Sequence, residues 1–152
     1  MKTNRIPLSV EAVEEKKNKL KQLLGLKKEV MKRLIIAREM GDLSENGAYK
    51  AAKFELGGIN RQLRELNFIL KHAYVPEVTT EVIAGFGKTI TLKNKEKELV
   101  FTLVGEYESD PEKMKFSLSS PIGLAVNGKQ IGDKIVVVSP NGKLNYSVIK
   151  IE

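Results

Sequence analysis

Several residue types are missing or scarce in this sequence, and their absence narrows the range of functions. The 152 residues include no cysteine and no tryptophan, and aromatic residues make up 6% of the chain. Without cysteine there is no disulfide framework, no thiolate nucleophile and no zinc–cysteine site. No apolar run approaches the roughly 18 residues of a membrane span, and no N-terminal stretch resembles a signal peptide. We therefore expect a cytoplasmic protein without a membrane partner.

Motifs of common enzyme classes are also scarce. His72 is the single histidine, and no acidic cluster lies near it in the sequence, so we expect it to be structural or exposed. The segment Gly85-Phe86-Gly87 is better interpreted as a turn into a strand than as a phosphate-binding loop. No arrangement of serine, histidine and acid suggests a hydrolase. These features do not indicate an enzyme.

Positive charge is concentrated in the first half of the chain. Residues 1–75 contain 16 Lys and Arg against 9 Asp and Glu, whereas residues 76–152 contain 10 of each sign, so the net charge of +7 belongs to the first half. Basic clusters of this kind attract phosphates or acidic protein surfaces. An ordinary solvated helix face is the alternative interpretation.

Apolar residues in residues 1–75 repeat with the three-and-four spacing of a coiled coil. In the second part of this region the repeat comprises Tyr49, Ala52, Leu56, Ile59, Leu63, Leu66 and Leu70. In the first part it runs through Val10, Val13, Lys17, Leu20, Leu24, Lys27, Met31, Leu34 and Arg38. The pattern predicts one helix from near Ser9 to Gly41 and a second helix capped by Ser44. Because the connection is short, the two helices form an antiparallel hairpin about 45 Å long for about 30 residues.

Two acidic residues, Asp42 and Glu45, lie in the connection between the predicted helices. A hairpin places them at its exposed tip, near residues 42–46. Taken alone, an acid pair at such a turn favours helix capping and a dipole interaction at the start of the second helix. The stiff helical arm instead favours a tip that reaches into a partner, although a coiled coil that merely dimerises is an alternative.

The residues after Tyr74-Val75-Pro76 show the two-residue alternation of strands. Strands are predicted at 89–92, 99–104, 116–118, 134–138 and 144–151, with a hairpin turn at Asn141-Gly142 and a short helix near 122–127 over one face. The prediction is thus an α+β chain: a helical arm over residues 1–75 and an antiparallel sheet domain over residues 76–152.

The sequence resembles the Gre family of bacterial transcript-cleavage factors. The resemblance rests on the segment Glu39-Met40-Gly41-Asp42-Leu43-Ser44-Glu45-Asn46, followed by Tyr49-Lys50-Ala51-Ala52-Lys53, and on the segments 119–123, 128–129, 131–133 and 140–149. These motifs cover both halves of the chain in the family's order. Gly47, Ala48 and Leu124 depart from the residues usual in the family.

The resemblance implies a fold, a partner and site residues. The C-terminal domain would be FKBP-like and dock on bacterial RNA polymerase, and the coiled coil would enter the polymerase's secondary channel as a monomer. Asp42 and Glu45 would share Mg²⁺ with the polymerase and stimulate its own cleavage of the nascent RNA 3′ end, supported by Ser44, Asn46 and Tyr49. No cofactor would be held stably by the chain alone. Contacts to RNA or polymerase are expected from Lys27, Lys28, Lys32, Arg33, Arg38, Lys50, Lys53, Ser120 and Pro121.

Three other functions fit parts of the sequence. A Gre-like protein of the same shape would block the secondary channel and inhibit the polymerase, which the retention of Asp42 and Glu45 disfavours. A prolyl isomerase would need an aromatic-lined pocket, for which the chain has few aromatics. A basic coiled-coil adaptor would bind free nucleic acid with a strong dependence on salt.

Overall fold

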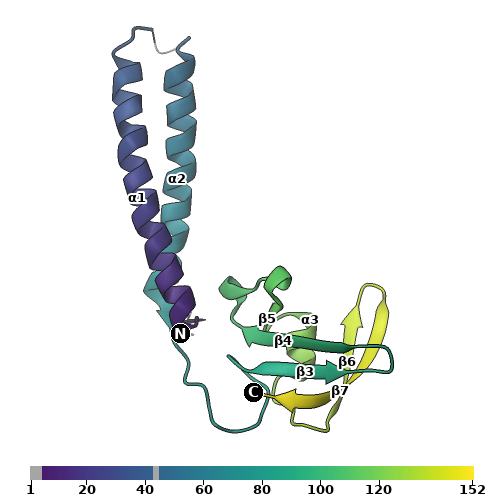
Figure 1. Ribbon diagram of the computed structural model, residues 1–152. Coiled ribbons are helices and arrows are strands. Elements are labelled where there is room, and N and C mark those ends of the chain that lie inside the picture. Colours follow the sequence, from purple (N-terminus) through teal and green to yellow (C-terminus); the bar gives the residue numbers. More distant parts are fainter. Residues whose placement is uncertain (1–4, 43–44) are drawn as a thin grey trace. The chain divides into compact units, whose positions relative to one another are not determined.

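The computed structural model describes residues 5–42 and 45–152. The chain divides into two compact units (Figure 1). One unit is Glu11–Ala73, and the other combines Tyr74–Glu152 with the segment Met1–Val10, of which residues 5–10 are described. No helix within the described ranges is long and apolar enough to cross a membrane.

The first unit is an antiparallel hairpin of two long helices, α1 (Val10–Arg38) and α2 (Gly47–His72), which run side by side in Figure 1. Helix α2 buries Ala52, Ile59, Leu63, Leu66 and Ile69, as expected for an amphipathic helix that packs along one stripe. The predicted helical hairpin is therefore confirmed. One position of the predicted repeat in α2 is wrong, because Ile69 is buried while Leu70 is only partly buried.

The predicted apolar repeat of α1 is wrong at every second position. The positions at Leu23, Val30 and Ala37 are buried, whereas Leu24 and Met31, which were predicted in their place, are 46% and 43% exposed. Arg38 is likewise exposed. Adjacent apolar pairs such as Leu23-Leu24 and Val30-Met31 satisfy a three-and-four spacing in either phase, so the packing against α2 decides which member is buried.

The second unit contains a five-stranded sheet in the order β5-β4-β3-β7-β6. Its strands are β3 (Thr89–Lys93), β4 (Glu98–Val104), β5 (Lys115–Ser117), β6 (Lys134–Ser139) and β7 (Gly142–Ile151). All five predicted strands are present, and the neighbours are antiparallel except β4 and β5, which are parallel. The predicted hairpin of β6 and β7 is present, but Ser139 pairs with Gly142, so the turn residues are Pro140 and Asn141.

The core of this unit lies between one face of the sheet and the short helix α3 (Pro121–Val126). Phe101, Ile90, Leu92, Leu103 and Val126 are almost fully buried in it. Two short 3₁₀ helices, η1 (Glu106–Glu108) and η2 (Pro111–Lys113), carry the chain from β4 to β5. The expected fold class, a helical hairpin plus a largely antiparallel sheet domain with a short helix, is confirmed.

The N-terminal segment is anchored to the sheet unit, which the sequence did not suggest. The Leu8 amide of this segment, just after β1 (Ile6–Pro7), donates to the Tyr74 carbonyl of β2 (Ala73–Tyr74) at 3.0 Å. The Ser9 amide donates to the Glu108 carboxylate at 3.1 Å, and the Ser9 hydroxyl donates to the same group. Gly105 permits this approach, because a Cβ there would lie 2.2 Å from the Pro7 carbonyl oxygen.

Candidate functional site: the tip and the basic faces of the helical hairpin

Helix α1 ends three residues before the predicted Gly41. The amide of Glu39 still donates to the carbonyl oxygens of Ile35 and Ile36, both at 3.2 Å, and the Met40 amide donates to Ala37 at 3.2 Å. Gly41 then has a φ of +112°, a backbone conformation that favours glycine. The left-handed glycine turns the chain out of the helix and leads it into the acidic segment.

Asn46 caps the second helix and ties it to the first. Its Oδ1 accepts a hydrogen bond from the Tyr49 amide at 3.0 Å, and its Nδ2 donates to the Ala37 carbonyl oxygen at 2.6 Å. The prediction that Ser44 caps this helix is wrong, since Asn46 is the N-cap of α2. Both ends of one amide are thus used to join the last turn of α1 to the first turn of α2.

Asp42 and Glu45 are both solvent-exposed, on either side of the pair Leu43-Ser44, which lies outside the described residues. Among residues 5–42 and 45–152, no three His, Cys, Asp or Glu side chains gather into a possible metal site. Two carboxylates are a sparse donor set for Mg²⁺, which prefers six oxygen ligands and often takes one or two of them from protein carboxylates. A Mg²⁺ ion at the tip would therefore need further ligands from elsewhere. Tyr49 is half-buried in the first turn of α2.

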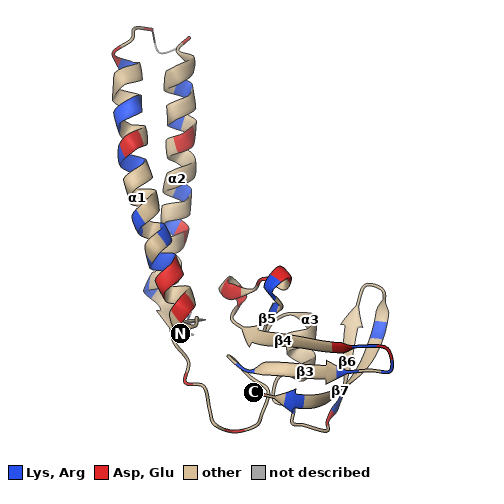
Figure 2. Ribbon diagram, viewed as in Figure 1, with Lys and Arg blue, Asp and Glu red and all other residues tan. Residues whose placement is uncertain are grey.

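The predicted basic residues lie along both helices of the hairpin, as the blue segments in Figure 2 show. Lys28, Lys32 and Arg38 of α1 and Lys50 and Lys53 of α2 are exposed, and Lys27 is partly buried. Arg33 differs from the others because its Nη2 lies 2.9 Å from Glu55 Oε2 on α2, which makes an ion pair between the helices. The sequence carried no signal for this partner, since the pairing depends on how the two helices align.

Ser120 and Pro121 lie in the sheet unit, where they begin α3. The Ser120 hydroxyl oxygen accepts from the Gly123 amide at 3.1 Å and donates to the Ser117 carbonyl at 2.6 Å, and Pro121 occupies the first turn. Pro is well suited to this position because its missing N–H has no helical partner there. Leu124 projects from the same helix with 72% of its surface exposed.

Comparison with known proteins identifies the family to which the chain belongs. Residues 6–75 match the family described as "Transcription elongation factor, N-terminal", and residues 79–152 match "Transcription elongation factor, GreA/GreB, C-term". The chain belongs to the GreA/GreB family. It is therefore a member of a family of transcription elongation factors, and the predicted resemblance is confirmed.

Full-length relatives agree with this assignment. The chain is 37% identical over 151 residues to transcription elongation factor GreA of Bacillus cytotoxicus, with 96% of both chains covered. It is 35% identical over 153 residues to GreA of Neorickettsia sennetsu, with 97% of this chain and 96% of that protein covered. Among solved structures it is similar to the GreA factor homolog 1 (Gfh1) protein of Thermus thermophilus, at 25% identity, coverage of 98% and 99%, and a TM-score of 0.47.

Proposed function

We propose that the chain stimulates RNA polymerase's own cleavage of the nascent RNA 3′ end in backtracked, arrested elongation complexes. The observation that carries the proposal is the tip: two exposed carboxylates, Asp42 and Glu45, in a connection whose ends are joined by Asn46. A slender hairpin with this tip suits insertion through the secondary channel of bacterial RNA polymerase. In this proposal the chain acts as a non-catalytic factor, and the polymerase supplies the rest of the active site.

The two carboxylates have separate tasks in this proposal. Asp42 would hold Mg²⁺ together with ligands of the polymerase, because a pair of exposed carboxylates cannot fill an octahedral shell. Glu45 would orient the attacking water and accept its proton. When bound, Mg²⁺ lowers the pKa of a coordinated water and stabilises the charge on the leaving oxygen.

The supporting residues hold these groups in place. The Asn46 side chain already spans Ala37 and Tyr49, so it would keep Glu45 at a constant position relative to the two helices. Tyr49, half-buried in the first turn of α2, would pack at the tip or meet the RNA, and Ser44 would hydrogen-bond to the attacking water.

Partner contacts would come from the basic residues and from the sheet unit. The exposed Lys28, Lys32, Arg38, Lys50 and Lys53 would lie against the extruded RNA or acidic channel walls, with a salt dependence expected for exposed charges. The turn around Ser120 and Pro121 would contribute to docking on the polymerase, with the exposed Leu124 beside it. Neutralising the basic residues should change binding more than chemistry.

The test is an RNA cleavage assay on stalled, backtracked bacterial elongation complexes with Mg²⁺. The wild-type chain should shorten the transcripts, and Asp42→Asn or Glu45→Gln should lower the saturated rate by ~10²-fold or more. Glu39→Gln is the matched control, because Glu39 is an exposed acid just after α1 and outside the acidic segment. Binding to polymerase, measured separately, should be nearly unchanged in all three variants.

Two outcomes would contradict the proposal. Wild-type cleavage by the Asp42→Asn, Glu45→Gln double variant would show that the carboxylates are not required. Polymerase binding with suppression of nucleotide addition and no cleavage would instead identify an inhibitor that blocks the secondary channel.

A further inference from the structure

The sheet unit carries a lysine-lined concavity of about 820 Å³, far along the chain from the acidic tip. It lies where the β3–β4 turn and the β6–β7 hairpin meet, at the end of the sheet where strand β3 stops at Lys93. Strand β7 continues beyond that point, because its pairing with β3 reaches only Ser147 while its pairing with β6 extends to Gly142. The missing length of β3 leaves a notch, and we call this concavity the lysine notch.

Strand register places the lysines on one face. Ser147 is paired with Lys93 on one side and with Lys134 on the other, so these three residues form a row across β3, β7 and β6. Directly paired residues share a face of the sheet, and two strand spacings separate the two lysine backbones by about 10 Å. Lys143 pairs with Val138 farther along the same hairpin and also lines the notch.

This face is opposite the core. Ile135, Val137, Tyr146 and Val148 alternate with Lys134, Val136, Ser147 and Ile149 along β6 and β7 and are buried in the cluster that includes Val126 of α3. Of these four core residues, Ile135 and Tyr146 also reach the notch. The row of Lys93, Ser147 and Lys134 therefore lies on the face that α3 leaves uncovered.

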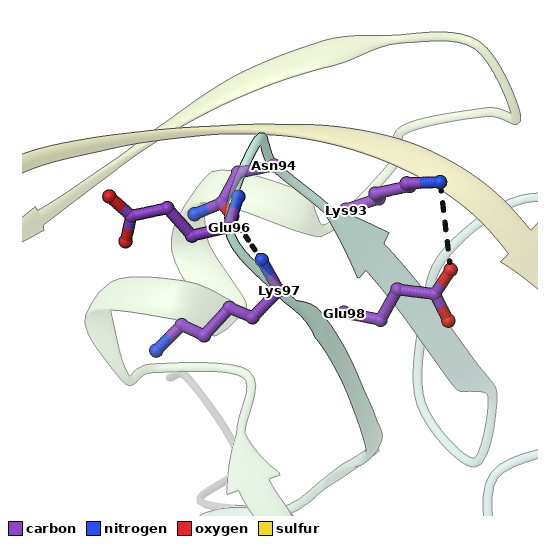
Figure 3. Close-up of polar contacts among 5 residues, drawn as sticks. All are labelled: Lys93, Asn94, Glu96, Lys97 and Glu98. Atoms are coloured by element: carbon purple, nitrogen blue, oxygen red, sulfur yellow. Dashed lines mark hydrogen bonds and ion pairs between the residues drawn. The ribbon is translucent and has the colours of Figure 1, made fainter.

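The wall formed by the β3–β4 turn is well ordered by its own hydrogen bonds (Figure 3). Asn94 Oδ1 accepts from the backbone amides of Glu96 and Lys97 at 2.9 and 2.8 Å, and the Asn94 amide donates to the Lys97 carbonyl at 3.0 Å. This turn presents Lys95 to the notch, with Glu96 as the single acid that lines it. Lys93 Nζ is 3.9 Å from Glu98 Oε1, a long ion pair between exposed groups that neutralises little of its charge.

The charge of the notch is a local feature of a neutral domain. Residues 76–152 contain 10 lysines, no arginine and 10 acids, yet the notch is lined by four lysines and one acid. The acids collect elsewhere: Glu106, Glu108, Asp110 and Glu112 lie in and beside η1 and η2, where Figure 2 shows red segments. Such segregation favours the approach of an anionic partner to the notch.

The uncharged residues that line the notch favour an acidic peptide over a nucleic acid as its partner. Val136 and Ile149 line it with 49% and 39% of their surfaces exposed, so a ligand can cover apolar surface there. Its one aromatic residue, Tyr146, is only 5% exposed and offers no platform on which a base can stack. Proteins that bind single-stranded nucleic acid combine a positively charged groove with exposed aromatic residues for base stacking and with arginine, and of these three features the notch has only the positive charge.

We propose that the lysine notch binds an acidic peptide segment of a partner protein, with carboxylates facing Lys93, Lys95, Lys134 and Lys143 and apolar side chains resting on Val136 and Ile149. This contact is separate from the chemistry of the tip and does not depend on it. It would give the sheet unit a second protein-binding surface beside the turn at Ser120 and Pro121.

The test uses the full-length chain and a synthetic twelve-residue peptide in which Asp and Glu alternate with Leu and Phe. The control peptide carries Asn and Gln in place of the acids. Binding is measured by the concentration dependence of backbone amide NMR shifts, which should move in 93–97, 134–136 and 143–149 and remain still in the helical hairpin. The control peptide should bind at least tenfold more weakly.

Variants then locate the site. Lys93→Gln with Lys134→Gln should weaken peptide binding by about three- to tenfold, the effect of removing two exposed charge contacts. The matched control is Lys115→Gln with Lys150→Gln, which removes two lysines of the same unit that do not line the notch. Val136→Ser, an exposed site where folding should be unaffected, should also weaken binding.

Several results would overturn the proposal. The proposal is wrong if the notch double variant and the control double variant bind the acidic peptide equally well. It is also wrong if the peptide shifts only the amide signals of the basic residues in the helical hairpin. Tighter binding of a single-stranded oligouridylate to the same residues would assign the notch to nucleic acid. Concentration-dependent shifts of the chain alone, unaltered by peptide, would assign it to the acidic 106–112 segment of a second copy.

Discussion

The side chain of Asn46 donates a hydrogen bond of 2.6 Å to the carbonyl oxygen of Ala37, nine residues earlier in the chain. Ala37 is 3% exposed in the last turn of α1, and its carbonyl oxygen also accepts from the Met40 amide at 3.2 Å. The same amide accepts from Tyr49 at the start of α2. One side chain thus bonds to backbone groups at the end of α1 and at the start of α2, and holds the acidic segment between them.

Two substitutions of Asn46 distinguish the contribution of its hydrogen bond with Ala37 from that of its hydrogen bond with Tyr49. Asn46→Ala removes both hydrogen bonds, whereas Asn46→Asp keeps the acceptor for Tyr49 but loses the donor to Ala37. We expect Asn46→Ala to lower the free energy of unfolding of the hairpin by about 1–2 kcal/mol, and Asn46→Asp to lower it less, because Asp is also a good N-cap. Denaturant unfolding followed by helical circular dichroism measures the difference.

Asn46→Asp also tests whether Asn46 positions the acidic tip for RNA cleavage. If the link to Ala37 orients the tip, the variant should slow RNA cleavage at saturating factor while its polymerase binding stays the same. A cleavage rate equal to that of the wild type would restrict Asn46 to helix stability.

The register of α1 predicts unequal effects at two neighbouring leucines. Leu23 is 8% exposed within the hairpin core and Leu24 is 46% exposed. Leu23→Ala should cost about 2–5 kcal/mol of unfolding free energy, because it removes buried methyl groups and leaves a cavity. Leu24→Ala should change it by about 0.5 kcal/mol or less. If thermal unfolding showed that the two variants lose the same unfolding free energy, the observed register of α1 would be contradicted.

Two glycines should respond to alanine in opposite directions. Gly57 lies in the interior of α2, and apart from its chain neighbours and the backbone of its own helix turns, nothing would lie within 4 Å of a Cβ added there. Gly57→Ala should therefore stabilise the hairpin by about 0.5–1 kcal/mol. At Gly123 a Cβ would lie 2.1 Å from the Ser117 carbonyl oxygen. Gly123→Ala should therefore displace the start of α3 and destabilise the sheet unit by about 1–3 kcal/mol. Separate melting of the helical and sheet signals would assign each effect to its unit.

The basic residues of the hairpin should affect factor concentration rather than chemistry. Replacing Lys28, Lys32, Lys50 and Lys53 by Gln should raise the concentration needed for half-maximal cleavage, more so at low salt, because screening acts over about 10 Å at 0.1 M ionic strength. The rate at saturation should change little. An unchanged concentration dependence at low salt would make these lysines an ordinary solvated face.

Arg33→Gln is the informative comparison for that series. Arg33 is paired with Glu55 across the hairpin, so its replacement should reduce hairpin stability by about 1 kcal/mol or less. Its effect on the half-maximal factor concentration should be smaller than that of a single substitution among the four lysines. A larger effect would mean that Arg33 exchanges Glu55 for a contact in the complex.

Local patterns were enough to predict the three α-helices and the five-stranded sheet, whereas β1, β2, η1 and η2 were not predicted. The helices of the hairpin, the five strands, the β6–β7 hairpin and the acids between the helices all follow from periodicity, turn residues and the order of motifs. These features depend on residues near one another in the chain, where backbone preference and side-chain alternation act directly.

Tertiary structure decided what depends on the alignment of separate elements. The burial of Leu23 rather than Leu24 was settled by the facing helix, and so was the pairing of Arg33 with Glu55. The link from Asn46 to Ala37 and the row of Lys93, Ser147 and Lys134 arise in the same way. A sequence specifies which residues can pack or pair, but several partners satisfy the same local pattern, and only the packed structure selects one of them.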